Sequence, residues 1–309
     1  MPSVKTILDN IAIEVDEPAE IAKCLKTKAL QPVAVVYAKN VSDILGLLAL
    51  PHYTLTIGLL EMLRNQFFVE AVAEMKIMLK SENDVAKVKE RAEQLLNQAR
   101  NNENSPKNPH KIANQIIGDL LKRTEVADAT RALLFAGITT CWAAFESAAK
   151  DIWIVALNSS PNVLGQPAIA KLPIEKESDG LSAKQISVGL LARNGFDLRN
   201  KLGFLLADKF DFTGVSGIRT AYVSAFGKIA PFDTIFDEPN LATLEATRHL
   251  IVHRAGFVDE EYKRRTKDST SIGDQIHLDG ERVCELVNSS IAVHCKLIKL
   301  VDNWLIKNQ

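Results

Sequence analysis

The sequence predicts a mainly all-α protein, in which a helical bundle follows a mixed, mostly helical N-terminal extension. Two patterns and one absence favour this class. Apolar residues recur every three or four positions between residues 128 and 157, as on the core-facing side of a helix. A second long helix is expected near the C-terminus, and no Gly-rich phosphate loop of either nucleotide-binding spacing is present. The apolar positions of the first pattern are Phe135, Ile138, Trp142, Phe145, Ala149 and Ile152.

The N-terminal third mixes several signals. Its first part, Ser3–Ala38, includes a β-branched run at 32–37 that favours a short strand, although one strand makes no sheet. Helices are expected at Leu55–Leu79 and Asn83–Arg100. The polar segment Asn101–Pro109 contains two prolines and no apolar residue, so it is expected to be a linker. We therefore predict an N-terminal region over 1–110 and an all-α domain over 111–309.

The remaining elements follow from the same periodicity. A Pro- and Gly-containing loop is expected at Ser159–Gly180. Asp237 or Asn240 is the expected N-cap of the helix that carries Arg248, and Gly256 suits its C-terminus. The helices predicted for the domain are Ile112–Lys122, Asp128–Leu157, Ser182–Arg193, Leu198–Asp208, Ser216–Lys228, Leu241–Ala255 and Asp279–Ile306.

Composition excludes several classes of protein. The 37 basic and 38 acidic residues nearly cancel, so nucleic-acid binding would need a local basic patch. The four cysteines are scattered without a Cys-x-x-Cys pair, which argues against zinc ribbons and favours reduced thiols in a cytoplasmic protein. The uncharged run Ile44–Leu60 is short and interrupted by Pro51, so we expect a buried helical hairpin and no membrane partner. Residues 1–10 show no secretory signal.

Arg248 lies within the apolar stripe of its predicted helix, which is formed by Leu241, Leu244, Ile251 and Ala255. A buried arginine is costly unless it is paired or given an anion. The same segment carries two histidines, whose pKa suits proton transfer near neutral pH. An anion-binding arginine beside proton-transfer groups indicates phosphate chemistry.

The run Arg248-His249-Leu250-Ile251-Val252-His253, continued to Gly256, Asp259 and Tyr262, resembles the signature of the HEPN superfamily (higher eukaryotes and prokaryotes nucleotide-binding). That signature is an arginine, a polar residue, a short apolar stretch and a histidine. The resemblance covers roughly Asp128 to Ile306. It implies a helical bundle whose motif helix packs against an earlier long helix. Many members are metal-independent endoribonucleases that act as homodimers in bacterial toxin–antitoxin or antiphage systems.

The resemblance implies an RNA substrate, a second copy of the chain and an antitoxin or regulatory protein as partners, with no cofactor or metal. Arg248 would stabilise the transition state, His253 would act as general acid or base, and His249 would orient the phosphate or share the proton transfer. Some members carry an acid-x3-Lys pattern, which Glu146 and Lys150 match as supporting residues.

Spacing on the helix raises a geometric problem. Arg248 and His253 lie about 140° apart on an ideal helix. A loosened last turn, or a second motif helix from a partner subunit, would bring such groups together. The RNA itself is expected to contact a local basic cluster with one aromatic residue: Arg254, Tyr262, Lys263, Arg264 and Arg265.

Three other interpretations stay open from the sequence. In the first, Arg248 forms a structural ion pair with Glu146, and the basic cluster is an ordinary solvated loop. Glu245, His249 and His253 share one helical face at the spacing of metal ligands, although the sequence shows no further ligand. In the third, the domain is a catalytically silent HEPN module that binds RNA, nucleotide or a protein partner.

Overall fold

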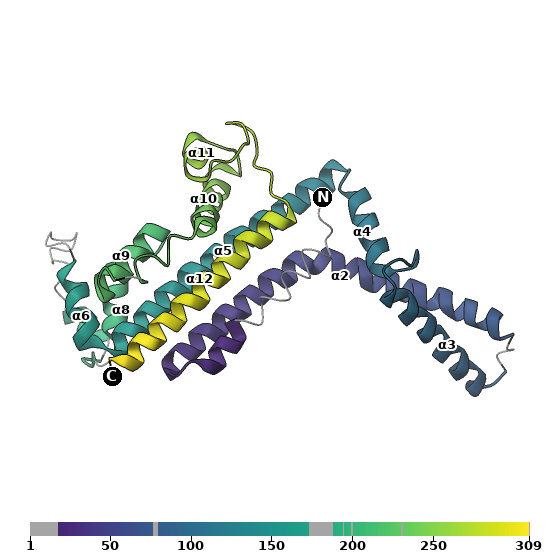
Figure 1. The fold of residues 1–309 in the computed structure, drawn as a ribbon, viewed down its shortest axis with the longest axis horizontal. Helices are drawn as coiled ribbons and strands as arrows, with labels where there is room; N and C mark the ends of the chain where they lie inside the picture. The colour runs from purple at the N-terminus through teal and green to yellow at the C-terminus, as the bar shows by residue number, and fades with distance from the viewer. Residues whose placement is uncertain are drawn as a thin grey trace. The chain divides into compact units, whose positions relative to one another are not determined.

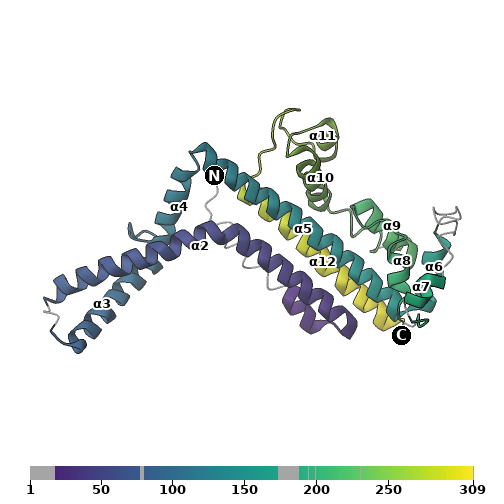
Figure 2. The ribbon, with the colours of Figure 1, turned by 180° about the vertical axis from the view of Figure 1, so that it is seen from behind.

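The structure is a computed structural model that describes residues 18–76, 80–172, 188–193, 195–198, 200–229 and 231–308. The described residues form helices and one isolated antiparallel β-bridge between Phe257 and Gln275, which confirms the all-α class (Figures 1 and 2). The elements are η1 (Lys28–Leu30), α2 (Gln31–Met75), α3 (Glu82–Asn101), α4 (Pro109–Leu120), α5 (Thr124–Ser159), α6 (Pro161–Ala170), α7 (Val188–Arg193), α8 (Leu202–Ala207), α9 (Val215–Phe226), α10 (Pro239–Arg254), α11 (Glu260–Thr266) and α12 (Gly280–Lys307).

The helices divide between two compact units. Unit 1 contains Leu45–Leu134, and unit 2 contains the described residues up to Ile44 together with those from Phe135 onward. This division differs from the boundary expected at residue 110. The physical reason is that α4 belongs with the helices before it: His110 Nδ1 lies 3.4 Å from His52 Nε2 of α2, and α4 also contacts α3.

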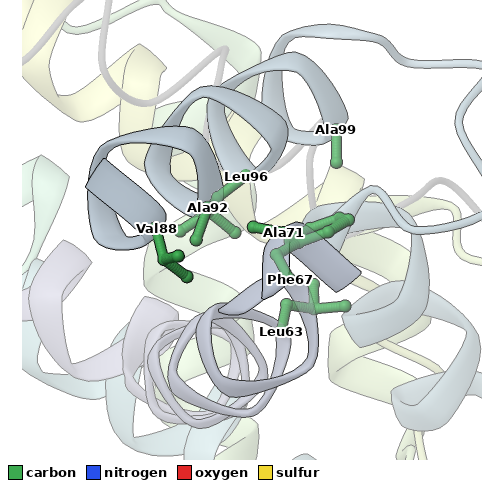
Figure 3. Close-up of a cluster of buried hydrophobic side chains, with 7 residues drawn as sticks. All are labelled: Leu63, Phe67, Ala71, Val88, Ala92, Leu96 and Ala99. Atoms are coloured by element: carbon green, nitrogen blue, oxygen red, sulfur yellow. The ribbon is translucent and has the colours of Figure 1, made fainter. Parts of the chain in front are cut away.

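Unit 1 is built on a helical hairpin of α2 and α3. Ser81 and Asp84 form a capping box at the start of α3. Figure 3 shows the apolar side chains of the two helices pointing toward one another. An ion pair between Arg64 and Glu93, at 2.7 Å, spans the same two helices on the exposed side. The buried residues of this core are Leu63, Phe67, Ala71, Val88, Ala92, Leu96 and Ala99.

The core of unit 2 lies among the N-terminal part of α2, α5 and α12. Its centre holds a polar cluster: Ser290 Oγ of α12 is 3.3 Å from Tyr37 Oη and 3.2 Å from Cys141 Sγ. The ring of His294 stacks on that of Tyr37, with centroids 3.7 Å apart. Asp302 accepts hydrogen bonds from the backbone N–H groups of residues 26 and 27, which ties the chain before α2 to α12.

Several predicted elements need correction. The strand expected at 32–37 is wrong, because these residues belong to α2 and bury Ala34 and Tyr37. The hairpin expected around Pro51 is also wrong, since α2 continues through that proline. Helix α6 forms within the segment where a loop was expected, and α11 forms where the alternative interpretation placed a solvated loop. The segment before Pro18 and the start of the predicted helix Ser182–Arg193 lie outside the described residues.

Two described helices are long and apolar enough to cross a membrane by length and composition alone, Lys28–Met75 and Thr124–Ser159. Core helices of soluble proteins meet the same criterion, and both helices supply buried side chains. The cytoplasmic location expected from the sequence stays a prediction.

Candidate functional site

The motif helix α10 is held at both ends by its backbone. Pro239 occupies its first position and Glu238, not the expected Asp237 or Asn240, is its N-cap. At the C-terminus, Ala255 is left-handed (φ 52°), and the N–H groups of Ala255 and Gly256 donate to the carbonyls of Ile251 and Leu250. Gly256 has φ +82°, and a Cβ there would lie 2.6 Å from the Phe135 ring of α5. The helix end predicted at Gly256 is confirmed.

Arg248 is half-buried on α10 and lies near Glu146 of α5, as the helical stripe indicated. No direct ion pair or hydrogen bond joins them within the described residues, so the structural pairing expected from the sequence is absent. Burial raises the pKa of Glu146, and the charges of Glu245 and Asp211 raise it further. The indole N–H of Trp142 and the Arg248 guanidinium act in the opposite direction.

Unsatisfied polar atoms mark this region of α5. Glu146 Oε1 and Trp142 Nε1 are both buried and make no hydrogen bond of normal geometry. Such atoms are rare in folded proteins and are costly to keep. Lys150, predicted to support Glu146, instead points to Asp208, with Nζ 3.4 Å from Oδ1. Glu146 is therefore placed beside Arg248 without the lysine that the acid-x3-Lys pattern would add.

The two motif histidines are exposed. The rings of His249 and His253 have centroids 4.4 Å apart, so they form one imidazole pair on the outer side of α10. The helix stays regular to Arg254, and a loosened last turn does not bring His253 toward Arg248. A second motif helix from a partner subunit, which would bring an arginine and a histidine together despite their separation on one helix, stays a prediction.

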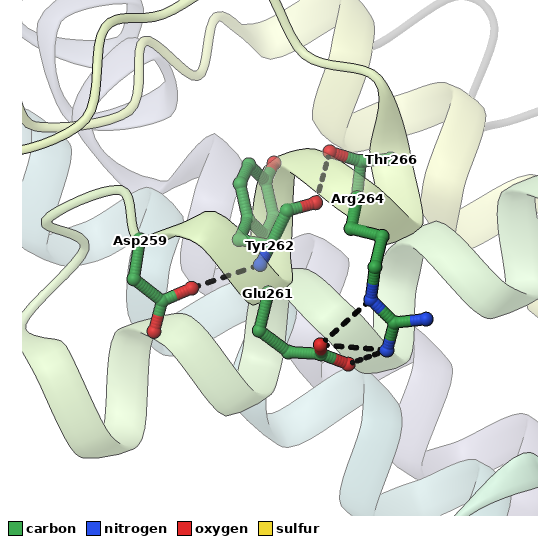
Figure 4. A network of polar contacts seen from close by, with 5 residues as sticks. All are labelled: Asp259, Glu261, Tyr262, Arg264 and Thr266. Carbon is green, nitrogen blue, oxygen red and sulfur yellow. Dashed lines mark hydrogen bonds and ion pairs between the residues drawn. The ribbon is translucent and has the colours of Figure 1, made fainter.

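Four members of the basic cluster lie on the short helix α11, and Arg254 ends α10. Figure 4 shows the polar contacts of Tyr262 and Arg264 with neighbouring residues. Arg264 binds the Glu261 carboxylate through Nε and Nη2 at 2.6 to 3.0 Å. The Asp259 carboxylate caps α11 by accepting from the Tyr262 N–H, and it lies 3.7 Å from Arg254 Nε. Lys263, the remaining member, is half-buried.

Tyr262 corrects one expectation. Its side chain is 5% exposed and belongs to a core cluster with Leu250 and Val258. Its hydroxyl lies 3.4 Å from Thr247 Oγ1 of α10. A buried ring offers no face to a nucleobase, so the stacking role expected for Tyr262 does not fit this position. The tyrosine instead packs α11 against the motif helix.

Arg265 binds Glu245, with Nη2 and Oε2 2.8 Å apart. This pairing engages the carboxylate that the sequence offered as a metal ligand beside His249 and His253. No group of three potential metal ligands occurs in the part of the chain that the structure describes. The sequence did not predict the Glu245–Arg265 pair, because the two residues lie on different helices. It also did not predict the influence of Asp211 on Glu146, because these two residues lie in different segments. Trp142 had a visible signal, since it precedes Glu146 by one helical turn.

No family model, curated protein or solved structure matches this chain. The HEPN resemblance stays a prediction based on the residues of α10.

Proposed function

We propose that the chain is a metal-independent endoribonuclease that cleaves RNA by attack of the ribose 2′-hydroxyl. One contrast supports it. Arg254, Arg264 and Arg265 all lie near Arg248 in the sequence, and each faces a carboxylate at ion-pair distance. Arg248 has no such partner among the described residues, although it is half-buried. A partly buried guanidinium without a bound carboxylate is suited to take an anion from solution.

The reaction assigns a task to each motif residue. The 2′-oxygen forms a bond to phosphorus as its proton leaves to a base, and the bond to the 5′-oxygen breaks as that oxygen gains a proton. The products are a 2′,3′-cyclic phosphate and a 5′-hydroxyl. Arg248 would bind the non-bridging oxygens, on which charge grows in the transition state. His253 would transfer protons, with His249 sharing that work or orienting the phosphate.

A homodimer is part of the proposal. Arg248 lies on the partly buried side of a regular helix, whereas His253 is exposed. Two motif helices facing each other would let the arginine of one copy and the histidine of the other meet one phosphate. A role in toxin–antitoxin or antiphage defence, with an antitoxin or regulator as a partner, follows from the HEPN resemblance. We expect the enzyme to act in the cytoplasm.

The test is incubation of the full chain with RNA in excess EDTA, followed by analysis of the product ends. Wild type should cleave and leave 2′,3′-cyclic phosphates. Arg248→Ala and His253→Ala should each slow cleavage by at least about 100-fold. Arg131→Ala is the control, because this arginine of α5 has no role in the proposed site and pairs with Asp128, and it should retain most of the activity.

Two outcomes would contradict the proposal. Cleavage that disappears in EDTA would point to metal catalysis. A wild-type chain that binds RNA without cutting it would favour the silent HEPN module. Circular dichroism of each variant shows whether a loss of rate reflects unfolding.

A further inference from the structure

The carboxylate of Glu245 joins three segments of unit 2. It lies on α10 three residues before Arg248, and it forms the 2.8 Å salt bridge with Arg265 of α11. Gly214, the N-cap of α9, lies directly against it: a Cβ at position 214 would be 2.9 Å from Glu245 Oε1. A side chain at position 214 would have to displace this carboxylate. This side chain of Glu245 thus joins α11 to the motif helix by an ion pair and lies against the start of α9.

The burial of this pair distinguishes it from the other salt bridge of α11. The side chains of Arg265 and Glu245 are 29% and 21% exposed, whereas those of Arg264 and Glu261 are 74% and 52% exposed. Exposed pairs three residues apart contribute little to stability. A more buried pair between helices fixes geometry, and its charges act over longer distances because water screens them less.

Glu245 also acts on the candidate site. Four groups influence the Glu146 carboxyl: Arg248 and Glu245 from α10, Asp211 from the segment before α9, and Trp142 from α5 itself. Lys150, one turn further along α5, is directed to Asp208. Arg265 is the only cation that binds Glu245 among the described residues. It therefore limits how strongly the Glu245 charge reaches Glu146.

We infer that Glu245 and Arg265 are positioning residues of the candidate site, which hold α10 in place and set the charge around Glu146 and Arg248. The catalytic consequence rests on the proposed nuclease function. The structural and electrostatic part does not. Arg265, expected from the sequence to bind RNA, and Glu245, expected as an alternative metal ligand, acquire one shared task.

Two substitutions separate positioning by charge from simple packing. Glu245→Gln and Arg265→Gln both break the salt bridge, so any structural loss is common to them. Their electrostatic effects on Glu146 are opposite. Glu245→Gln removes a negative charge and should lower the pKa of Glu146, whereas Arg265→Gln leaves that charge without its partner and should raise it.

The measurement is a carbon-13 NMR titration of the Glu146 carboxyl in the full chain, with the signal assigned from Glu146→Gln. We expect the pKa of Glu146 to shift downward in Glu245→Gln and upward in Arg265→Gln. Arg265→Lys keeps the charge and should return the titration toward wild type. Glu261→Gln removes the exposed partner on α11 and should leave it unchanged.

Shifts of Glu146 in the same direction in both variants, or in neither, would overturn the inference. If wild type cleaves RNA, its single-turnover rate should change in both variants, because each alters the charge around Glu146 and Arg248. If wild type does not cleave RNA, the proposed function fails, yet the titration still decides whether the salt bridge controls Glu146.

Discussion

Lowering the pH from 7 to 5 should destabilise unit 2 through His294 of α12. This side chain is 1% exposed, its Nε2 is buried without a hydrogen-bond partner, and its ring stacks on Tyr37. Burial lowers the pKa of His294 from 6.5 to about 3, because the cation would lose its hydration inside the bundle. The folded chain therefore keeps this histidine neutral at pH values where the unfolded chain protonates it.

The size of the effect follows from proton linkage. A base with a lowered pKa in the folded state contributes fully above its unfolded pKa of 6.5, and the contribution falls as the pH drops toward 3. Each pH unit in this window changes the free energy of unfolding by about 1.4 kcal/mol. At pH 5 the loss attributable to His294 is about 2 kcal/mol.

The assay is urea unfolding at pH 7, 6 and 5, followed by tryptophan fluorescence. All three tryptophans, Trp142, Trp153 and Trp304, belong to unit 2, so their emission reports on the unit that contains His294. His294→Leu cannot titrate at this position, and its stability should depend less on pH between 7 and 5 than that of wild type. An equal pH dependence in the two proteins would show that His294 does not cause the loss of stability.

Four further substitutions test the packing. Phe67→Ala should weaken the α2–α3 hairpin by about 3 to 5 kcal/mol, seen as faster hydrogen exchange along α3, and unchanged protection there would argue against this core. Asp302→Ala leaves two backbone N–H groups without their acceptor and should cost about 1 to 3 kcal/mol in urea unfolding, while an unaltered midpoint would contradict the contact. Ala255→Gly should raise the melting temperature, because glycine adopts the left-handed conformation without strain. Gly256→Ala should lower the melting temperature through backbone strain and contact with Phe135. A lower melting temperature for Ala255→Gly than for Gly256→Ala would contradict this helix end.

Long helices were the most predictable part of the fold. The apolar periodicity of α5 and the polar cap of α12 define these helices without knowledge of their neighbours, and α12 begins after Asp279 as expected. The residues 32–37 misled, because a β-branched run has strand propensity while its burial against α12 selects a helix. The prediction of a break at Pro51 was also wrong, since the helix continues through this proline as part of a 45-residue element.

The candidate site was predictable only along single helices. The half-burial of Arg248 follows from its place in the stripe, and the His249–His253 pairing follows from their spacing. The partner of Arg265 could not be predicted in this way, because Glu245 lies 20 residues earlier and the turn between α10 and α11 brings the two residues together. The burial of Tyr262 depends on the same turn. Periodicity within one helix carries no information about such contacts.

The most direct test of the central claim is the single-turnover rate of RNA cleavage in EDTA by wild type and by Arg248→Lys. Lysine keeps the positive charge but cannot bind two phosphate oxygens through a planar fork. We predict a rate about 100-fold lower for Arg248→Lys, with Arg131→Lys close to wild type. Equal rates for wild type and Arg248→Lys would show that the Arg248 guanidinium does not meet the scissile phosphate.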